Sequence, residues 1–498
     1  MNPSTVTATV VTPSPTSVEE VRTIIDGAAA SADRWAATTA QDRGQILEQV
    51  ADALDSYSDY LIAIAAQETH LTELRLRGEL KRTTFQLRLF AGVLSEGSYL
   101  DVRIDHADPD WPMGAPRPDL RRILHPLGPV VVFAASNFPF AFSVAGGDTA
   151  SALAAGCPVV LKAHSGHPRL SAATGRIVNQ ALHTAGAPEG LFTVIFGTES
   201  GKVALNDPRI KAGSFTGSIP GGRALFDIAN SRPEPIPFFG ELGSVNPTFV
   251  TRAAAQARGV QIAGDFVASF TMSAGQFCTK PGILFVPEDS IIPEVLGSTS
   301  LPAPAALLNN RIQQGYLDVL SELRAHRDVS ILAQGADSLA DPPSPTILKT
   351  SISALLADPH SLFRECFGPT ALVVTYDDEG ALLDVARGLD GQLTATVHGE
   401  GHEPLLPELV RLLAQKAGRL LWNQWPTGVS VTYAQQHGGP YPATTNSGST
   451  SVGTAAITRF LRPVAYQNFP VALLPSALTD ENPVRIPRRV DGHLVTHP

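Results

Sequence analysis

The sequence predicts an α/β protein with a doubly wound parallel sheet and a second α/β domain. Between residues 127 and 250, short apolar runs alternate with helical runs, a pattern typical of parallel βαβ units. Residues 264–429 repeat this alternation less regularly. The chain of 498 residues also exceeds what one hydrophobic core usually organises, so two or three domains are expected.

The N-terminal region predicts a tail followed by helices. Residues 1–17 are rich in Thr, Pro and Ser, with no basic start and no long apolar core, so we expect a flexible tail rather than a targeting signal. Residues 18–97 carry apolar side chains at the spacing of amphipathic helices. Residues 102–122, rich in Asp, Pro and Arg, predict a hairpin at the edge of the fold.

The alternating region predicts short strands joined by helices. The expected strands are 129–134, 158–162, 192–196, 213–215 and 247–250. The expected helices are 145–155, 169–185 and 222–230. Residues 126–147 form one uncharged run, but its prolines and glycines predict a buried strand and a loop rather than a membrane span.

Composition argues against several classes of function. The net charge of −10 disfavours a nucleic-acid partner. The three cysteines, Cys157, Cys278 and Cys366, are too widely spaced for a disulfide framework and show no metal-ligand spacing. We therefore predict no metal site and a reducing, cytoplasmic compartment. Cys157 and Cys366 are interpreted as core thiols.

Cys278 is the residue that most directly suggests a chemistry. It lies among small residues and glycine, where a substrate carbonyl can approach closely, and Glu241 precedes it by 37 positions. A thiol can capture a carbonyl carbon, and a carboxylate can activate the water that releases it. The pair predicts catalysis through a thioester. A cysteine hydrolase is the alternative, although none of the thirteen histidines stands in a recognisable partner motif.

Asn137 is a second candidate for the same site. It follows a strongly apolar strand, and open α/β sheets place ligands at the carboxyl ends of strands. Its side-chain amide can donate a hydrogen bond to an oxyanion. An Asn/Pro turn without a catalytic role is the alternative interpretation.

Three further segments suggest a nucleotide. Lys162 ends a predicted strand and suits a ribose or phosphate, unless it merely reaches solvent. Residues 215–223 combine a strand end, a glycine turn and a helix start, whose amides suit a pyrophosphate. This run is neither a G-x-G-x-x-G fingerprint nor a P-loop. Glu365 and Phe367 either hold a nicotinamide ribose and ring or belong to a structural loop.

In order along the chain, these segments resemble the aldehyde dehydrogenase superfamily. The matching pieces are Asn137-Phe138-Pro139, Lys162, Phe215-Thr216-Gly217-Ser218, Glu241-Leu242-Gly243, Gly275-Gln276-Phe277-Cys278 and Glu365-x-Phe367-Gly368-Pro369. The resemblance implies a Rossmann-type cofactor domain, a catalytic domain and an oligomerisation arm. The implied boundaries are 18–105 and 124–240 for the cofactor domain, 241–435 for the catalytic domain, and 106–123 and 436–498 for the arm and C-terminal tail.

The resemblance also implies roles for single residues. Cys278 attacks an aldehyde, Asn137 holds the oxyanion and Glu241 activates water in an NAD(P)-dependent oxidation. Contacts to the cofactor are expected from Lys162, Ser165, Phe215, Thr216, Gly217, Ser218, Gly222, Leu242, Glu365 and Phe367. Ser165 stands where NAD-preferring relatives commonly carry a glutamate, so NADP is predicted to be preferred, with NAD as the alternative. A homodimer or homotetramer is expected.

More narrowly, four runs resemble the branch of 2,5-dioxovalerate, or alpha-ketoglutarate semialdehyde, dehydrogenases. These runs are residues 79–88, 134–143, 162–164 and 437–443. The implied reaction converts 2,5-dioxopentanoate into 2-oxoglutarate. Fatty or other aliphatic aldehyde dehydrogenases of the same superfamily are the alternative.

Substrate contacts are expected from a helix that lines the tunnel in this superfamily. Arg82 lies on that helix, with Gln86 one turn on and on the same face. A guanidinium there would bind the distal carboxylate of a short oxo acid bidentately. A surface arginine is the alternative. Phe138, Phe277 and Trp425 are expected to line the rest of the tunnel, or to pack in the core.

Overall fold

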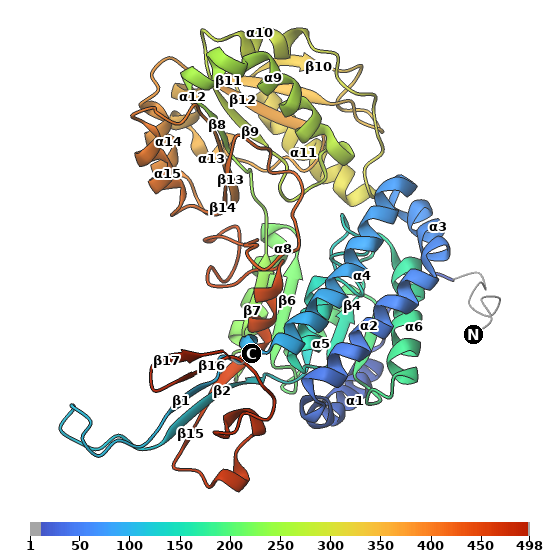
Figure 1. Ribbon diagram of the computed structural model, residues 1–498. Helices are drawn as coiled ribbons and strands as arrows, with labels where there is room; N and C mark the ends of the chain where they lie inside the picture. The colour runs from blue at the N-terminus through green and yellow to red at the C-terminus, as the bar shows by residue number, and fades with distance from the viewer. Residues whose placement is uncertain (1–10, 497–498) are drawn as a thin grey trace.

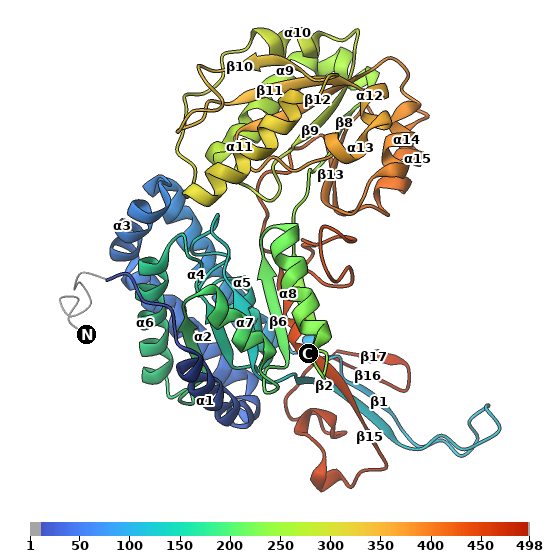
Figure 2. The same ribbon diagram turned by 180° about the vertical axis from the view of Figure 1, so that it is seen from behind.

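The computed structural model describes residues 11–496, which form three sheets (Figures 1 and 2). The first sheet is parallel, with strand order β5-β4-β3-β6-β7. Its strands are β3 (Val130–Phe133), β4 (Val159–Lys162), β5 (Phe192–Ile195), β6 (Ala212–Thr216) and β7 (Phe238–Glu241). Between them run α5 (Gly147–Ala155), α6 (Pro168–Thr184), α7 (Thr198–Asn206) and α8 (Ile219–Ser231). The predicted doubly wound sheet is confirmed.

Four helices precede this sheet, as the sequence predicts. They are α1 (Val18–Ala37), α2 (Ala40–Ser56), α3 (Ser58–Thr69) and α4 (Glu73–Glu96), followed by the 3₁₀ turn η2 (Ser98–Leu100). Helices α2, α4, α5 and α6 pack in one apolar cluster on one face of the sheet, and α1, α7 and α8 cover the other face. Since apolar side chains cover both faces, the strands are almost continuously hydrophobic.

Part of the predicted tail is attached to the first sheet. Ser17 forms a capping box with Glu20 at the start of α1. The Thr16 backbone N–H donates to the Phe196 carbonyl at 2.9 Å, and Ser200 Oγ donates to the Thr16 carbonyl at 2.6 Å. The prediction of a flexible tail is therefore wrong at its C-terminal end, because these backbone groups have partners. Residues 1–10 of that tail lie outside the described residues.

The second sheet has the order β10-β11-β12-β9-β8-β13-β14, with only β10 antiparallel to its neighbour. Its strands are β8 (Thr248–Val250), β9 (Ile283–Pro287), β10 (Ser330–Gln334), β11 (Thr346–Ser351), β12 (Thr370–Tyr376), β13 (Gln392–His398) and β14 (Ala417–Trp422). Its helices are α9 (Arg252–Thr271), α10 (Ile291–Ser298), α11 (Asn310–Ala325), α12 (Ile352–Ala357), α13 (Pro359–Leu362), α14 (Ala381–Gly388) and α15 (Leu406–Leu413). Figure 1 shows this layer above the first sheet.

One predicted strand belongs to the other sheet. The alternation grouped residues 247–250 with the strands of the first sheet, although the implied boundary at residue 241 assigned them to the catalytic domain. In the structure, β8 pairs with β9 and β13 in the second sheet. The strand that completes the first sheet is β7, which the sequence analysis did not predict. Only four residues long and ending in Gly-Glu, β7 lacks the apolar run that marks its neighbours.

The third sheet forms an arm that projects from the body (Figure 1). Its order is β15-β2-β1-β16-β17, built from β1 (Arg103–Asp105), β2 (Leu120–Pro126), β15 (Leu461–Gln467), β16 (Arg488–Val490) and β17 (His493–Val495). The short turns η5 (Val471–Leu473) and η6 (Ser476–Leu478) lie between β15 and β16. Strands β1 and β2 form the predicted hairpin over residues 102–122.

The segment before β15 differs from the prediction that residues 436–498 form the arm and tail. Residues 443–445 run alongside β7: Leu242 donates its backbone N–H to the Ala443 carbonyl at 2.8 Å, and Thr445 donates to Gly240 at 3.0 Å. The turn η4 (Thr454–Phe460) packs against α5. This return segment therefore lies beside the end of the first sheet.

Along residues 11–496, no helix is both long enough and apolar enough to cross a bilayer.

Candidate active site

Cys278 is held on a tight turn that follows α9. The turn η3 (Met272–Gly275) places Ser273 and Ala274 in the left-handed region, at φ +50° and +53°. Gly275 follows at φ +69°, and a Cβ there would lie 2.0 Å from the Gly368 carbonyl oxygen. Only glycine satisfies both constraints. Strained turns of this kind persist where the surrounding structure holds them, often at functional sites.

A buried asparagine anchors the same loop from behind. Asn246 Nδ2 donates to the carbonyls of Cys278 at 2.8 Å and Lys280 at 2.9 Å. Its Oδ1 accepts from Thr394 Oγ1 at 2.9 Å, which ties the loop to β13. The backbone that carries the thiol is thus fixed to the second sheet.

Three reactive side chains meet at this point. Cys278 Sγ lies 3.5 Å from His437 Nε2, and the same nitrogen lies 2.8 Å from Glu241 Oε1. Ser451 Oγ donates to the other carboxylate oxygen of Glu241. Glu241 ends β7, while His437 and Ser451 come from the return segment. The predicted pair of Cys278 and Glu241 is therefore brought together, with a histidine that the sequence analysis missed.

Burial and neighbouring groups shift the pKa values of Cys278 and Glu241 in opposite directions. Burial, together with the Glu241 carboxylate, raises the pKa of the Cys278 thiol well above its usual range, and Arg82 opposes this. Burial also acts to raise the pKa of Glu241, but the electrostatic attraction of His437 and the hydrogen bonds from His437 and Ser451 outweigh it, so this pKa is lowered. Near neutral pH the resting pair is a thiol beside a carboxylate.

Asn137 lies against the loop that carries Cys278 (residues 272–280, the thiol loop). Its Nδ2 donates to the Gln276 carbonyl at 3.2 Å. Its own backbone carbonyl accepts from Arg75 Nη2 at 2.6 Å, an arginine from α4. The side-chain amide is therefore held against Gln276, which stands two residues before Cys278 in the chain. Its contact with an oxyanion stays a prediction.

A cavity of about 240 Å³ leads to Cys278. It is lined by Arg75, Gly78, Glu79, Arg82, Phe138, Phe142, Phe277, Cys278, Thr279, Gly428 and Val429. Arg82, Phe138 and Phe277 thus lie where the sequence predicts a substrate tunnel. Arg75 was missed, although it precedes Arg82 by two helical turns on the same face of α4.

Two predicted tunnel residues lie elsewhere. Gln86 is buried with its Nε2 near Gly147, because one further turn along α4 moves its side chain about 6 Å past the cavity. Trp425 packs on Phe266 and on His398, with ring centroids 5.6 and 4.7 Å apart, in the core of the second layer. For Trp425, the alternative of packing in the core describes the structure.

The Arg82 guanidinium has an unusual environment. Within residues 11–496 it has no hydrogen bond or ion pair to another side chain, and its Nε is buried without a partner. It lies over the rings of Phe138 and Phe142, at 5.6 and 5.3 Å from their centroids. Burial lowers the pKa of Arg82, and Glu79 opposes that shift. Glu79 Oε1 meanwhile accepts from the backbone N–H groups of Phe140 and Ala141.

Several residues predicted to bind a cofactor gather at the carboxyl end of the first sheet. Ser218 caps α8 by accepting from the Gly221 N–H at 3.4 Å. A Cβ on Gly222 would lie 2.0 Å from Leu242, so the helix start approaches the strand end closely. Phe215 and Thr216 end β6, and Gly217 lies in the turn before α8. Gly217 and Ser218 are exposed at this edge, where the sequence predicts a pyrophosphate site.

Lys162 lies at the end of β4 on the same edge. Burial and the nearby charge of Arg311 lower its pKa. Arg311, in the first turn of α11, comes from the second layer. In the described part of the chain, the Lys162 ammonium forms no hydrogen bond or ion pair. Ser165 follows in an exposed turn. Two neighbouring cations at this edge suit an anionic ligand.

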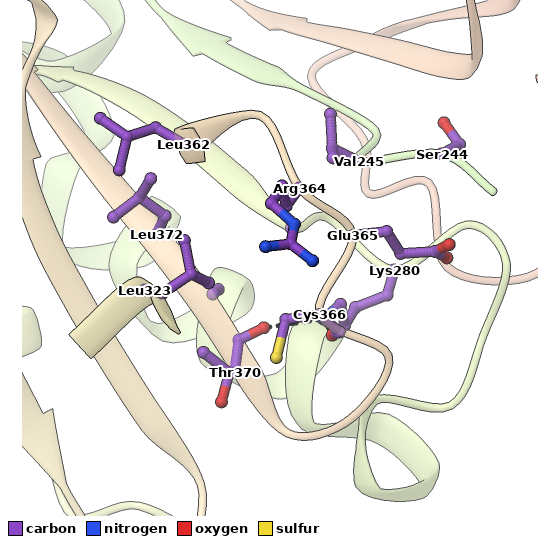
Figure 3. A pocket seen from close by; sticks show the side chains of 12 residues that line it. Ser244, Val245, Lys280, Leu323, Leu362, Arg364, Glu365, Cys366, Thr370 and Leu372 are labelled. Carbon is purple, nitrogen blue, oxygen red and sulfur yellow. Dashed lines mark hydrogen bonds between the residues drawn. The ribbon is translucent and has the colours of Figure 1, made fainter. Parts of the chain in front are cut away.

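Glu365 belongs to a loop that a buried lysine holds (Figure 3). Lys280 Nζ donates to the carbonyls of Thr370 at 2.7 Å and Gly368 at 3.1 Å, and also to that of Cys366. Burial raises the pKa of Glu365 to about 7, although the Lys280 charge opposes the shift. Lys280 therefore links the thiol loop to the loop that carries Glu365 and Phe367. The predicted ribose and nicotinamide contacts of these two residues stay predictions.

His437, Ser451 and Lys280 had different signals in the sequence. Lys280 stands two residues after Cys278 and could have been singled out by that proximity. His437 and Ser451 are 196 and 210 residues from Glu241 in the sequence. A local sequence pattern does not predict contacts between residues so far apart in the chain.

Comparisons with known proteins agree with this architecture. A sequence profile of the aldehyde dehydrogenase family matches residues 1–300. The chain is 45% identical over 463 residues to an alpha-ketoglutaric semialdehyde dehydrogenase of Acinetobacter baylyi, covering 92% of this chain and 88% of that protein. It is 44% identical to alpha-ketoglutaric semialdehyde dehydrogenase 2 of Azospirillum brasilense, covering 92% and 89%.

Solved structures share the fold. The crystal structure of aldehyde dehydrogenase 21 from Physcomitrella patens, in complex with the reaction product succinate, aligns with a TM-score of 0.73 at 23% identity. The alignment covers 92% of each chain. The resemblance and the fold class predicted from the sequence are both confirmed.

Proposed function

This chain belongs to the aldehyde dehydrogenase family, and from that premise we propose that it oxidises 2,5-dioxopentanoate to 2-oxoglutarate with NADP as the preferred cofactor. Two relatives with 45% and 44% identity carry the name alpha-ketoglutaric semialdehyde dehydrogenase. The observation in the molecule that carries the proposal is the Arg82 guanidinium, which faces the cavity without a protein acceptor.

Arg82 favours a substrate that carries a carboxylate at the end of its chain farthest from the aldehyde. The Nε–H of this guanidinium is buried without an acceptor, which is costly because the group loses water and gains no hydrogen bond in return. The distal carboxylate of a short oxo acid would supply two parallel hydrogen bonds and the opposite charge. An alkyl chain would leave the cost uncompensated. The aromatic walls, Phe138, Phe142 and Phe277, then surround the carbon chain.

Cys278 is the proposed nucleophile. Cys278 Sγ and a Glu241 carboxylate oxygen lie within 4.8 Å of one another, so we propose that this carboxylate accepts the thiol proton as sulfur attacks the aldehyde carbon. The oxyanion of the resulting thiohemiacetal would accept hydrogen bonds from Asn137 Nδ2 and the Cys278 backbone N–H. A bound nicotinamide supplies a hydride acceptor. Loss of hydride from the substrate carbon leaves a thioester on Cys278.

Release of the product needs an activated water. Both oxygens of Glu241 have partners, His437 and Ser451, which hold the carboxylate beside the sulfur. His437 Nδ1 is buried without a partner, whereas Nε2 faces a carboxylate, so we assign the ring proton to Nε2. In this state His437 donates to Glu241 and keeps it oriented. Once Glu241 has released the thiol proton to solvent, it removes a proton from water, which hydrolyses the thioester and frees the Cys278 sulfur.

The basic edge near Lys162 supports the choice of NADP. Lys162 and Arg311 would hold the 2′-phosphate, with Ser165 placing no negative charge beside it. Ser218 and the amides that begin α8 would hold the pyrophosphate, and Glu365 the nicotinamide ribose. The ratio of kcat/KM for NADP to that for NAD tests this choice; a ratio below one would contradict it.

We also propose a cytoplasmic location, because Cys157, Cys278 and Cys366 are all unpaired.

The substrate assignment is tested by comparing aldehydes on the wild type and on Arg82→Ala. We expect a higher kcat/KM for 2,5-dioxopentanoate than for hexanal. In the variant, the KM for the oxo acid should rise at least roughly tenfold, as loss of a charged hydrogen-bonded pair implies, while the KM for hexanal stays nearly constant. Arg88→Ala, on the same helix but in an exposed ion pair, is the control. A wild-type preference for hexanal would instead establish an aliphatic aldehyde dehydrogenase.

A further inference from the structure

The active-site cluster has the composition of a zinc site. Cys278 offers sulfur, His437 offers Nε2 and Glu241 offers a carboxylate oxygen, and these three atoms lie within 4.8 Å of one another. Thiolate, imidazole and carboxylate are the ligands that Zn²⁺ prefers in proteins. We propose that this cluster binds Zn²⁺, or another thiophilic divalent cation, and that binding reversibly blocks the enzyme. The inference uses the same side chains as the proposed function but does not depend on which aldehyde is the substrate.

The two separations from His437 Nε2 suit tetrahedral coordination after a small adjustment, and the Cys278 and Glu241 ligand atoms lie within 4.8 Å of one another. Zinc bonds of about 2.0–2.3 Å imply ligand-to-ligand separations of roughly 3.3–3.7 Å. The 3.5 Å between Cys278 Sγ and His437 Nε2 falls inside that range. The 2.8 Å between His437 Nε2 and Glu241 Oε1 is a hydrogen-bond distance and must open by about half an ångström. Ser451 holds the other oxygen of Glu241 and would orient the carboxylate as a ligand.

The site keeps one coordination position open to the cavity. Glu241 and His437 are buried, at 3% and 0% exposure, whereas Cys278 lines the cavity of about 240 Å³. A hydrated cation can therefore enter by the route proposed for the substrate and retain one water. Three protein ligands and one open position are typical of exchangeable zinc sites, while structural sites are closed by four protein ligands.

Binding requires a defined movement of protons. The Cys278 thiol loses its proton to solvent as the sulfur–zinc bond forms, and no group is oxidised or reduced. The proton on His437 Nε2 moves to Nδ1, which frees Nε2 for the metal. Among the described residues His437 Nδ1 has no hydrogen-bond partner. Metal-bound histidines usually have such a partner, and its absence weakens binding. The structure thus favours a reversible inhibitor over a resident cofactor.

Occupation by a cation would prevent both halves of the proposed reaction. The thiolate would be a metal ligand and not a nucleophile, and Glu241 could not accept a proton from water. Substrate captured on Cys278 would in turn exclude the metal. The enzyme would consequently lose activity in free zinc, and acylation of the sulfur would protect it.

Cobalt binding to the full-length protein, without cofactor or aldehyde, tests the inference. Co²⁺ replaces Zn²⁺ in such sites and shows a sulfur-to-metal charge-transfer band when a thiolate binds it. We expect one Co²⁺ per chain, displaced by Zn²⁺. The band should vanish in Cys278→Ser, and the affinity should fall roughly tenfold or more in His437→Gln. Cys157→Ala and His398→Gln, which alter a buried cysteine and a buried histidine outside the cluster, should bind as the wild type does.

The outcomes separate the metal site from the catalytic proposal. A band that persists in Cys278→Ser, or no band in a wild type that turns over aldehyde, would overturn the inference while leaving the proposed function intact. Circular dichroism shows whether a variant is folded. As a second measurement on the wild type, activity lost in Zn²⁺ should return on adding a chelator. Loss that a chelator cannot reverse would also overturn the inference.

Discussion

At the scale of single residues, the proposed chemistry depends on a carboxylate that stays charged although it is buried. His437 and Ser451 lower the pKa of Glu241 against the effect of burial, and the charged carboxylate in turn raises the pKa of Cys278. The sulfur is therefore protonated at rest, with its proton acceptor already in place. Transfer of the thiol proton to Glu241 gives the nucleophile as the sulfur attacks.

His437→Gln tests whether the histidine orients this carboxylate. Glutamine can still donate one hydrogen bond but cannot reproduce the geometry of the ring, so we expect kcat to fall by roughly 10²-fold, with little change in the KM for the cofactor. Hydrolysis of the thioester should become the slow step, visible as a burst of reduced cofactor in stopped flow. A variant with wild-type kcat would exclude this role. Ser451→Ala, which removes the other partner of Glu241, is the matched comparison.

At the scale of elements, the thiol loop and the loop of residues 365–370 form one unit. Lys280 joins them through three backbone carbonyls, and Gly275 packs against Gly368 so closely that no Cβ fits. Such contacts couple the position of the nucleophile to that of Glu365, the proposed ribose ligand. The coupling explains why a lysine, two residues from the thiol, is buried in an otherwise apolar layer.

Lys280→Met should separate the two loops. The substitution keeps the length of the side chain but removes a donor from the carbonyls of Cys366, Gly368 and Thr370, which costs about 2 kcal/mol of unfolding free energy. Loss of the ammonium also removes the charge that opposes the raised pKa of Glu365. Glu365 would then be neutral over more of the range near pH 7, so the KM for NADP should rise. Denaturant unfolding and steady-state kinetics measure both effects.

Lys349→Met is the control for this prediction. Lys349 pairs with Glu288 at the surface, where an ion pair contributes little to stability. Equal effects of the two substitutions would contradict the role given to Lys280.

The same elements show how far the sequence predicts the site. Motifs that lie on one strand end or one turn, such as Asn137 after β3 and Ser218 before α8, were placed correctly because the local sequence determines them. His437 was missed, since its contact with Glu241 depends on a return segment that pairs with β7. Gln86 lies on the predicted face of α4, but it does not line the cavity, which ends before the helical turn that carries it.

At the scale of the whole molecule, the arm exposes apolar side chains that a monomer would leave in water. Phe469, Val471 and Leu473 are 46%, 57% and 67% exposed on the segment that follows β15. Contiguous exposed apolar residues mark interaction surfaces. The homodimer or homotetramer expected from the family therefore has a candidate contact.

Light scattering on the purified protein measures the oligomeric state directly. We expect the mass of a dimer or tetramer, and a shift toward the monomer in a Val471→Asp, Leu473→Asp variant, because buried charge opposes association. Val260→Asp, an exposed apolar residue of α9 away from the arm, should not change the mass. A wild-type monomer would contradict the expectation.

The overall fold was largely predictable, and its exceptions have a common cause. Strands with an apolar run, such as β3 and β4, were identified close to their observed ends. The assignment of β8 to a sheet was wrong, because a three-residue strand shows which residues are extended but not which neighbours it pairs with. Pairing is set by distant segments, here β9 and β13, that the local pattern does not contain.

The central claim is that Cys278 carries the oxidised substrate as a thioester until Glu241 admits water. Glu241→Gln should slow the capture of the aldehyde but impair release more strongly, because a thiol can lose its proton to solvent whereas water, a much weaker acid, needs the base. The variant is therefore mixed with 2,5-dioxopentanoate and NADP, quenched in acid, digested and analysed by mass spectrometry. We predict one 2-oxoglutaryl group on the peptide that contains Cys278, formed together with one equivalent of reduced cofactor. An unmodified Cys278 after reduced cofactor has formed, or an acyl group on another residue, would contradict the account.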